Sequence, residues 1–75
     1  MTTDTIINLL SRGGNVRISA RGQEPETMKR FAAFAKRGGG HVTFVIGDTH
    51  VDPDTLNEVA GHGQSNVTFD FVSHA

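Results

Sequence analysis

The chain has 75 residues, of which 36% are hydrophobic and none is cysteine, and its formal net charge is −1. This length allows one domain, residues 1–75, that buries only about 60% of the surface of its unfolded chain, and no disulfide can reinforce it. Seven basic and eight acidic residues nearly cancel, so the net charge does not predict a nucleic-acid or membrane-surface partner.

The sequence also lacks the patterns of membrane and exported proteins. No apolar stretch approaches the roughly 20 residues that a membrane-spanning helix needs. The first residues include Asp4 and no basic region, unlike a secretory signal peptide. The lack of cysteine fits a reducing compartment, and we therefore expect a cytoplasmic protein.

Three helices are predicted from their start and end signals, at residues 4–12, 25–37 and 53–60. The first follows threonines that can cap a helix, and each of the others begins with an acidic residue, a proline and a second acidic residue. Glycine clusters follow all three, as expected for helix C-caps. Apolar residues spaced three and four apart give each helix one core-facing side. These residues are Ile6, Ile7, Leu10, Met28, Phe31, Ala32, Ala35, Leu56, Val59 and Ala60.

After each glycine cluster the hydrophobic period changes to two, which predicts strands near residues 15–20, 41–46 and 66–72. Apolar side chains then point to one face of the sheet and mainly polar ones to the other. The apolar set is Val16, Ile18, Ala20, Val42, Phe44, Ile46, Val67, Phe69 and Phe71.

The helix-strand unit occurs three times, which predicts a small α/β repeat. Strands of a parallel sheet covered on both faces are apolar throughout, so the alternation favours helices on one face only. Right-handed crossovers on a single side then place the three strands in the order 1-2-3, with the other face open. The doubly wound order 2-1-3 would bury polar positions of the first strand without evident partners.

From Val16 to Phe71, this arrangement resembles in outline the ribonuclease-inhibitor type of leucine-rich repeat, in which strands line one surface and helices the other. The resemblance rests on hydrophobic spacing. The Leu-rich strand signature and the turn Asn of that family are missing from this chain, so we carry over no functional residue.

Two loops resemble ligand sites and have simpler interpretations. The segment 36–41 is rich in glycine and basic residues, but it follows a helix and precedes a strand, opposite to a phosphate-binding loop, so we interpret it as a helix C-cap. The segment 48–54 collects carboxylates and an imidazole at the expected carboxyl edge of the sheet. Helix capping explains Asp52 and Asp54, whereas Asp48, His50 and His74 leave open an alternative metal-binding protein or metal-dependent enzyme.

The polar sheet face is the principal candidate for function. The simplest interpretation of this face is ordinary solvation, but an uncovered parallel sheet carrying valines among charges favours a docking surface. The outer strands also present edges that can pair with another chain. The predicted protein-binding residues are Arg17, Ser19, Arg21, Thr43, Val45, Thr68, Asp70 and Val72.

We therefore predict a small non-enzymatic protein-binding module that binds itself as a homodimer, or serves as an adaptor or inhibitor of a larger protein. For an inhibitor, a phage or mobile-element origin would be the natural expectation. No cofactor or small-molecule substrate is evident. Nucleic acid is disfavoured because the chain has no Trp or Tyr for base stacking. Phe34 lies beside the apolar side of the second helix, where it can bury a partner or flank the core.

Overall fold

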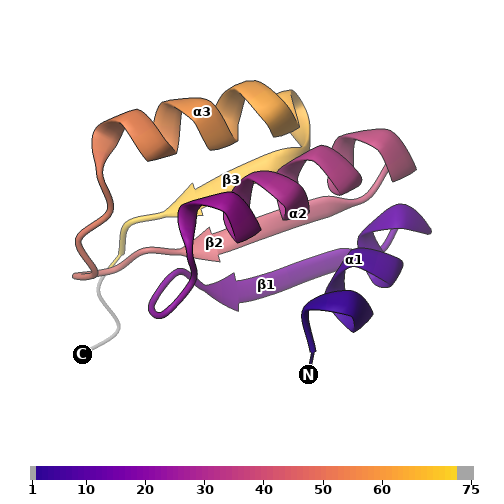
Figure 1. Ribbon diagram of the computed structural model, residues 1–75, viewed down its shortest axis with the longest axis horizontal. Helices are drawn as coiled ribbons and strands as arrows, with labels where there is room; N and C mark the ends of the chain where they lie inside the picture. The colour runs from indigo at the N-terminus through magenta and orange to yellow at the C-terminus, as the bar shows by residue number, and fades with distance from the viewer. Residues whose placement is uncertain (1, 73–75) are drawn as a thin grey trace.

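A computed structural model of this protein describes residues 2–72, in which helices and strands alternate along the chain (Figure 1). Each of the three strands follows one α-helix, and a 3-10 turn links the last pair. The elements are α1 (Thr3–Ser11), β1 (Asn15–Ser19), α2 (Pro25–Gly38), β2 (His41–Val45), α3 (Pro53–Gly63), η1 (Gln64–Asn66) and β3 (Val67–Asp70). The predicted α/β alternation is thus confirmed.

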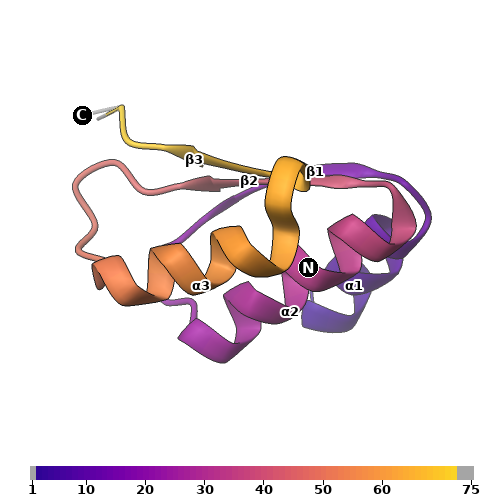
Figure 2. The ribbon, with the colours of Figure 1, turned by 90° about the horizontal axis from the view of Figure 1, so that it is seen from above.

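The three strands form one parallel sheet in the order β1-β2-β3. Its register aligns Val16 with Val42 and Val42 with Val67, and it aligns Ile18 with Phe44 and Phe44 with Phe69. All three helices lie on the same side of the sheet, as Figure 2 shows with the sheet seen edge-on. Both the strand order and the one-sided helix layer agree with the prediction, because a right-handed crossover repeated on one side moves each strand to the next position.

One hydrophobic core lies between the sheet and the helices. Its centre consists of fully buried side chains from both layers, and the half-buried residues Val16, Ile18, Val67 and Phe69 of the outer strands pack against it. The outer strands are less buried because each has a neighbour on one side only. The buried apolar residues are Ile6, Ile7, Leu10, Ala20, Met28, Phe31, Ala32, Ala35, Val42, Phe44, Ile46 and Val59.

The helix termini follow the capping signals with one exception. The hydroxyl of Thr2 accepts a hydrogen bond from the Thr5 amide at 3.2 Å, and Asp52 accepts one from the Asp54 amide at 3.1 Å. Glu24 precedes Pro25 in the same way but makes no side-chain cap. At its other end α2 stops at Gly39, whose φ of 76° is the left-handed conformation that glycine adopts readily. No helix among residues 2–72 is both long and apolar enough to cross a membrane.

The predicted end of the third helix at residue 60 is wrong, because α3 continues to Gly63. Gly63 is buried, and a Cβ added there would collide with a methyl group of Val67 and lie 3.1 Å from the Cβ of Ala32. This glycine therefore provides space for close packing, and the positive φ of 50° falls on Gln64. Ala60, predicted in the core stripe, is exposed.

The third strand is also shorter than predicted, since β3 ends at Asp70 rather than at residue 72. The Asp70 carboxylate accepts a hydrogen bond from the amide of Val72 at 2.9 Å, a local turn that competes with extended strand structure. Phe71, predicted in the core, is consequently 58% exposed. Its ring still contacts Phe69, with ring centroids 6.4 Å apart.

Candidate functional site

The side of the sheet opposite the helices is a surface that we call the open face (Figure 2). Alternate strand residues point to it because successive side chains of a strand point to opposite sides. The opposite residues of the central strand β2, Val42 and Phe44, are fully buried against the helices. The open face consists of Asn15, Arg17, Ser19, His41, Thr43, Val45, Thr68 and Asp70.

An ion pair crosses the open face from one outer strand to the other. Arg17 Nη2 on β1 donates a hydrogen bond to Asp70 Oδ2 on β3 at 2.7 Å. In the register, Arg17 aligns with Thr43 and Asp70 aligns with Val45, so the pair runs diagonally across β2. The Arg17 side chain is 56% exposed and that of Asp70 is 18% exposed. Because Arg17 remains largely in water, we expect the pair to contribute only about 0.2–1 kcal/mol.

A second polar contact joins the central strand to β3. His41 Nε2 and Thr68 Oγ1 are hydrogen-bonded at 2.6 Å. His41 is absent from the predicted surface residues, although it precedes Thr43 and Val45 by two and four positions and therefore shares their face. Asn15 was missed in the same way. Extending the two-residue period to the first residue of each strand would have found both.

Six of the eight predicted residues lie on the open face, and Arg21 and Val72 lie beyond the strand ends. The Arg21 amide donates a hydrogen bond to the Ser19 hydroxyl at 3.1 Å, and Val72 makes the turn to Asp70 described above. A short polar side chain at the end of β1 and of β3 thus binds the amide two residues later and turns the backbone out of the sheet. Both Arg21 and Val72 are exposed beside the open face.

The open face combines charge neutrality with a partly apolar centre. Val45 and Thr43 on the central strand are half-buried by their neighbours. The only charged side chains of the eight are Arg17 and Asp70, which neutralise each other. This surface has no Phe, Tyr or Trp for base stacking and no excess of positive charge, the two features that typify nucleic-acid binding.

The acidic loop between β2 and α3 borders a cleft of about 250 Å³. The cleft lies between this loop and the segment that follows β1, at the carboxyl edge of the sheet where open α/β proteins often bind ligands. Gln23, Thr49, His50 and Asp52 supply polar groups, and Met28 and Val51 supply apolar ones. The Asp52 carboxylate already caps α3, which gives it a structural role at the border of the cleft.

The alternative metal site is divided between described and undescribed residues. Asp48 and His50 are exposed in the acidic loop, whereas His74 lies outside the described residues. Within residues 2–72, no group of three or more His, Cys, Asp or Glu residues is placed to hold a metal ion. The metal alternative therefore remains a sequence prediction.

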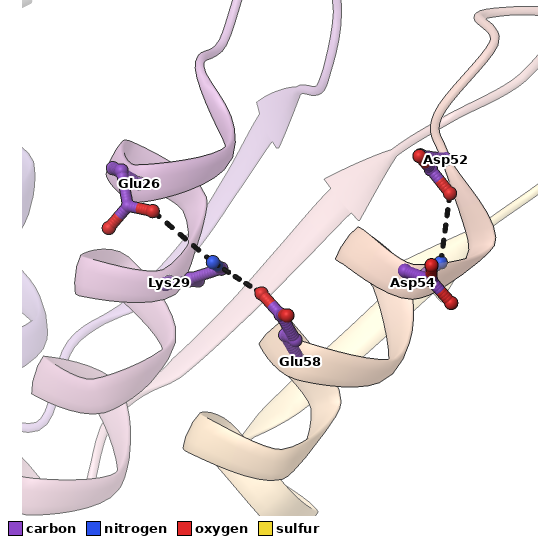
Figure 3. Close-up of polar contacts among 5 residues, drawn as sticks. All are labelled: Glu26, Lys29, Asp52, Asp54 and Glu58. Carbon is purple, nitrogen blue, oxygen red and sulfur yellow. Dashed lines mark hydrogen bonds and ion pairs between the residues drawn. The ribbon is translucent and has the colours of Figure 1, made fainter.

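Figure 3 shows the ion pairs and the cap hydrogen bond that carboxylates of the helix layer make. Lys29 of α2 lies between Glu26, one helical turn before it, at 3.2 Å, and Glu58 of α3. The hydrogen bond with Glu58, followed by that with Glu26, raises the pKa of Lys29 above its ordinary value. This contact joins α2 to α3 on the side of the molecule away from the open face, which is consistent with a structural role.

Phe34 lies at the margin of the core. It is half-buried and packs against the buried cluster, and the Arg37 guanidinium lies 5.5 Å from the centre of its ring. Cation–π contacts of this kind stabilise an exposed site by about 0.5–1 kcal/mol. Of the two interpretations of Phe34, the structure therefore supports the core-flanking one.

Comparisons with known proteins give no additional assignment. The chain matches no protein-family model, and neither curated proteins nor solved structures show significant similarity to it. The candidates for a functional site are therefore the open face, the strand edges and the cleft.

Proposed function

We propose that this protein is a small protein-binding module, located in the cytoplasm, whose working surface is the open face together with the outer edges of β1 and β3. It would act as a homo-oligomer, or as a compact adaptor or inhibitor of a larger protein. The observation that carries the proposal is a parallel sheet with all its helices on one side. Parallel sheets are almost always covered on both faces.

The composition of the open face supports a protein partner. Interface centres are depleted in unpaired charge and contain apolar groups within a polar rim. Here Val45 and Thr43 form the centre, and the only two charges of the eight residues are already paired across it. A partner covering Val45 would not have to desolvate a lone charge, which is the main cost of burying ionic groups.

Arg17 and Asp70 can also select the partner. The Arg17 side chain is largely exposed, so a carboxylate on a partner could share its guanidinium, which has five donors. Electrostatic complementarity of this type contributes more to specificity and association rate than to affinity. We therefore expect binding to weaken with increasing salt concentration.

The proposal is tested with the double variant Arg17→Glu/Val45→Glu. It places negative charges at the edge and at the centre of the open face without changing the buried side of the sheet. Affinity capture from the native host should lose the proteins that the wild-type chain retains. Thermal unfolding followed by circular dichroism should show that the variant remains folded.

Arg30→Glu is the control, because it makes the same charge change as Arg17→Glu alone, at an exposed position of α2. It should retain the captured proteins. Equal capture by the wild type, the double variant and the control would rule out the open face as the binding surface.

A further inference from the structure

The outer edges of the sheet differ in the backbone groups and side chains that they present. In a parallel ladder, successive residues direct their N–H and C=O groups to opposite sides of the strand. The Asp70 carbonyl accepts the amide of Ile46, the residue after β2, at 2.7 Å, so the preceding residue Phe69 directs its backbone groups outward. At the end of β1, the amide of the next residue, Ala20, donates to the Val45 carbonyl of β2, so Arg17 and Ser19 direct theirs outward.

We infer that β3 is the edge at which two copies of this chain associate, with the two β3 strands antiparallel and Phe69 on the two-fold axis. This inference rests on the proposed function and names the partner of one strand edge. It joins two three-stranded sheets into one continuous sheet. No other strand among residues 2–72 pairs with the outer side of β3.

The sequence of this edge is self-complementary in the proposed register. Residues 67–71 read Val-Thr-Phe-Asp-Phe, a pattern of apolar and polar positions that is symmetric about Phe69. Antiparallel pairing places Phe69 opposite itself and Thr68 opposite Asp70 of the second copy. Because β3 ends at Asp70, the pairing would extend the strand by one residue to bring Phe71 opposite Val67 of the second copy. The residues with outward backbone groups thus form the hydrogen-bonded pairs, and Thr68 and Asp70 form the non-hydrogen-bonded pairs.

Apolar burial favours this pairing. Phe71 is 58% exposed and Val72 is 64% exposed, at the end of a row of rings that begins in the core. Phe44 stacks on Phe69 with centroids 6.1 Å apart, and Phe71 continues the row. A second copy of β3 extends this row across the two-fold axis and covers Phe71 with the half-buried Val67 of the other chain.

The polar side chains of the open face are compatible with the same register. Asp70 would lie opposite the Thr68 hydroxyl and near the His41 imidazole that is bonded to it. Arg17 of the same chain neutralises the Asp70 carboxylate. The corresponding self-pairing of β1, centred on Arg17, would instead place two guanidinium groups directly opposite each other. Like charges at that position are destabilising, and a charged edge strand typically prevents association.

The flank of α3 beside this edge is compatible with a second copy. Glu58 faces α2 through its contact with Lys29, and Val59 is buried in the core. Asn57, Ala60 and Gly61 therefore lie on the side of the helix that faces away from α2, since residues three or four apart share a side. All three are exposed and uncharged, and Ala60 and Gly61 are also small, so two α3 helices can approach each other below the joined sheets.

The first test is sedimentation of the full chain over a wide concentration range. We expect the wild type to form a dimer and Phe71→Lys to increase its dissociation constant at least about tenfold. Leu9→Lys is the matched control, because Leu9 is also an exposed apolar residue, at 42%, but lies on α1. It should leave the dimer intact. A monomeric wild type, or equal weakening by both variants, would overturn the inference.

The second test measures the register and does not depend on Phe71→Lys being folded. Because the chain has no cysteine, an introduced cysteine is its only thiol. One preparation carries Thr68→Cys and the other carries Asp70→Cys. Residues in a non-hydrogen-bonded antiparallel pair have Cα atoms about 4.5 Å apart, within disulfide range. Mild oxidation of the mixture should yield a disulfide-linked dimer, and each variant alone should yield much less.

A mixture of Asn15→Cys and Ser19→Cys applies the same test to β1, where pairing would be centred on Arg17. Cross-linking in this control that equals or exceeds that of the Thr68 and Asp70 mixture would overturn the assignment to β3. Cross-linking of Asp70→Cys to a different host protein, with a monomeric purified chain, would also overturn self-pairing. If that monomer still captures a partner through the open face, the proposed function stands while this inference fails.

Discussion

The two faces of the sheet are built from alternate residues of the same strands, yet they differ in burial. On β2, Phe44 is fully buried against the helices, whereas its neighbours Thr43 and Val45 are half-buried on the open face. The covered face supplies the apolar burial on which a chain of this length depends. The open face contributes little to that burial, so the fold constrains its side chains less.

The largest expected effect follows from deleting a side chain on the covered face. Phe44→Ala removes a fully buried ring and should lower the free energy of unfolding by about 3–5 kcal/mol. A core of this size supplies only about 3–5 kcal/mol in total, so much of the variant should be unfolded at room temperature. Thr43→Ala should change stability by less than about 0.5 kcal/mol. Similar losses in urea denaturation of the two variants would contradict the comparison.

A second prediction concerns close packing on the covered side. Gly63→Ala places a methyl group against Val67 and Ala32, so we expect a loss of about 1–3 kcal/mol from overpacking. Gly61→Ala is the control in the same helix, because an added Cβ meets no atom within 4 Å. It should stabilise the protein by about 0.4–1 kcal/mol. Melting temperatures that move in the same direction would show that Gly63 is not needed for space.

On the open face, Arg17→Ala removes one member of the pair with Asp70. The exposed position limits the expected loss of stability to about 0.2–1 kcal/mol, and the loss should shrink as salt is added. The measurement is chemical denaturation at low and high salt. A loss above about 2 kcal/mol that does not depend on salt would mean that the open face supports the fold much more than we infer.

The outer surface of the helices provides a pH-dependent test. Because its carboxylate partners raise the pKa of Lys29 above the ordinary value of 10.5, the folded state binds this proton more tightly than the unfolded state. The stabilisation is fully present below pH 10.5 and is lost as pH rises through the folded-state pKa. Lys29→Met should remove this dependence, and Lys36→Met, which keeps the Lys29 contacts, should retain it. Parallel stability profiles for all three proteins above pH 10 would contradict the assignment.

The smallest expected effect is at the acidic loop, which belongs to neither face. Addition of Zn²⁺ or Mg²⁺ should leave the melting temperature of the wild type unchanged. Asp48→Ala/His50→Ala should respond in the same way as the wild type. A metal-induced increase in melting temperature that disappears in the double variant would revive the metal-binding alternative.

The sequence predicted the layers of this fold because two hydrophobic periods and three capped helices each point to one arrangement. Phe44 and Val45 were assigned to opposite faces from alternation alone. The end of β3 was not predicted, because it depends on Asp70 binding the amide of Val72. This turn replaces the strand structure that the apolar residues at 71 and 72 suggest. Gly63 was interpreted as a helix end because its close approach to Val67 and Ala32 is visible only in three dimensions.

The candidate surface was predicted in part for similar reasons. The period of two identified Arg17 and Asp70 as residues of one face, but their contact across β2 requires the strand register. The cleft beside His50 was not predicted, since it is formed by two loops whose separation follows from the packing of α2 and α3. Side-chain alternation thus predicts which face a residue occupies, and register decides which residues meet.

The most direct test of the account is the reactivity of single cysteines introduced into this cysteine-free chain. Thr43→Cys places a thiol at the centre of the open face, and Arg30→Cys places one on α2. Alkylation rates should be compared between the dilute purified chain and the chain in an extract of its native host. We predict that the thiol at position 43 becomes protected in the extract while that at position 30 reacts equally fast in both. Protection at position 30 with none at position 43 would contradict the open face as the binding surface.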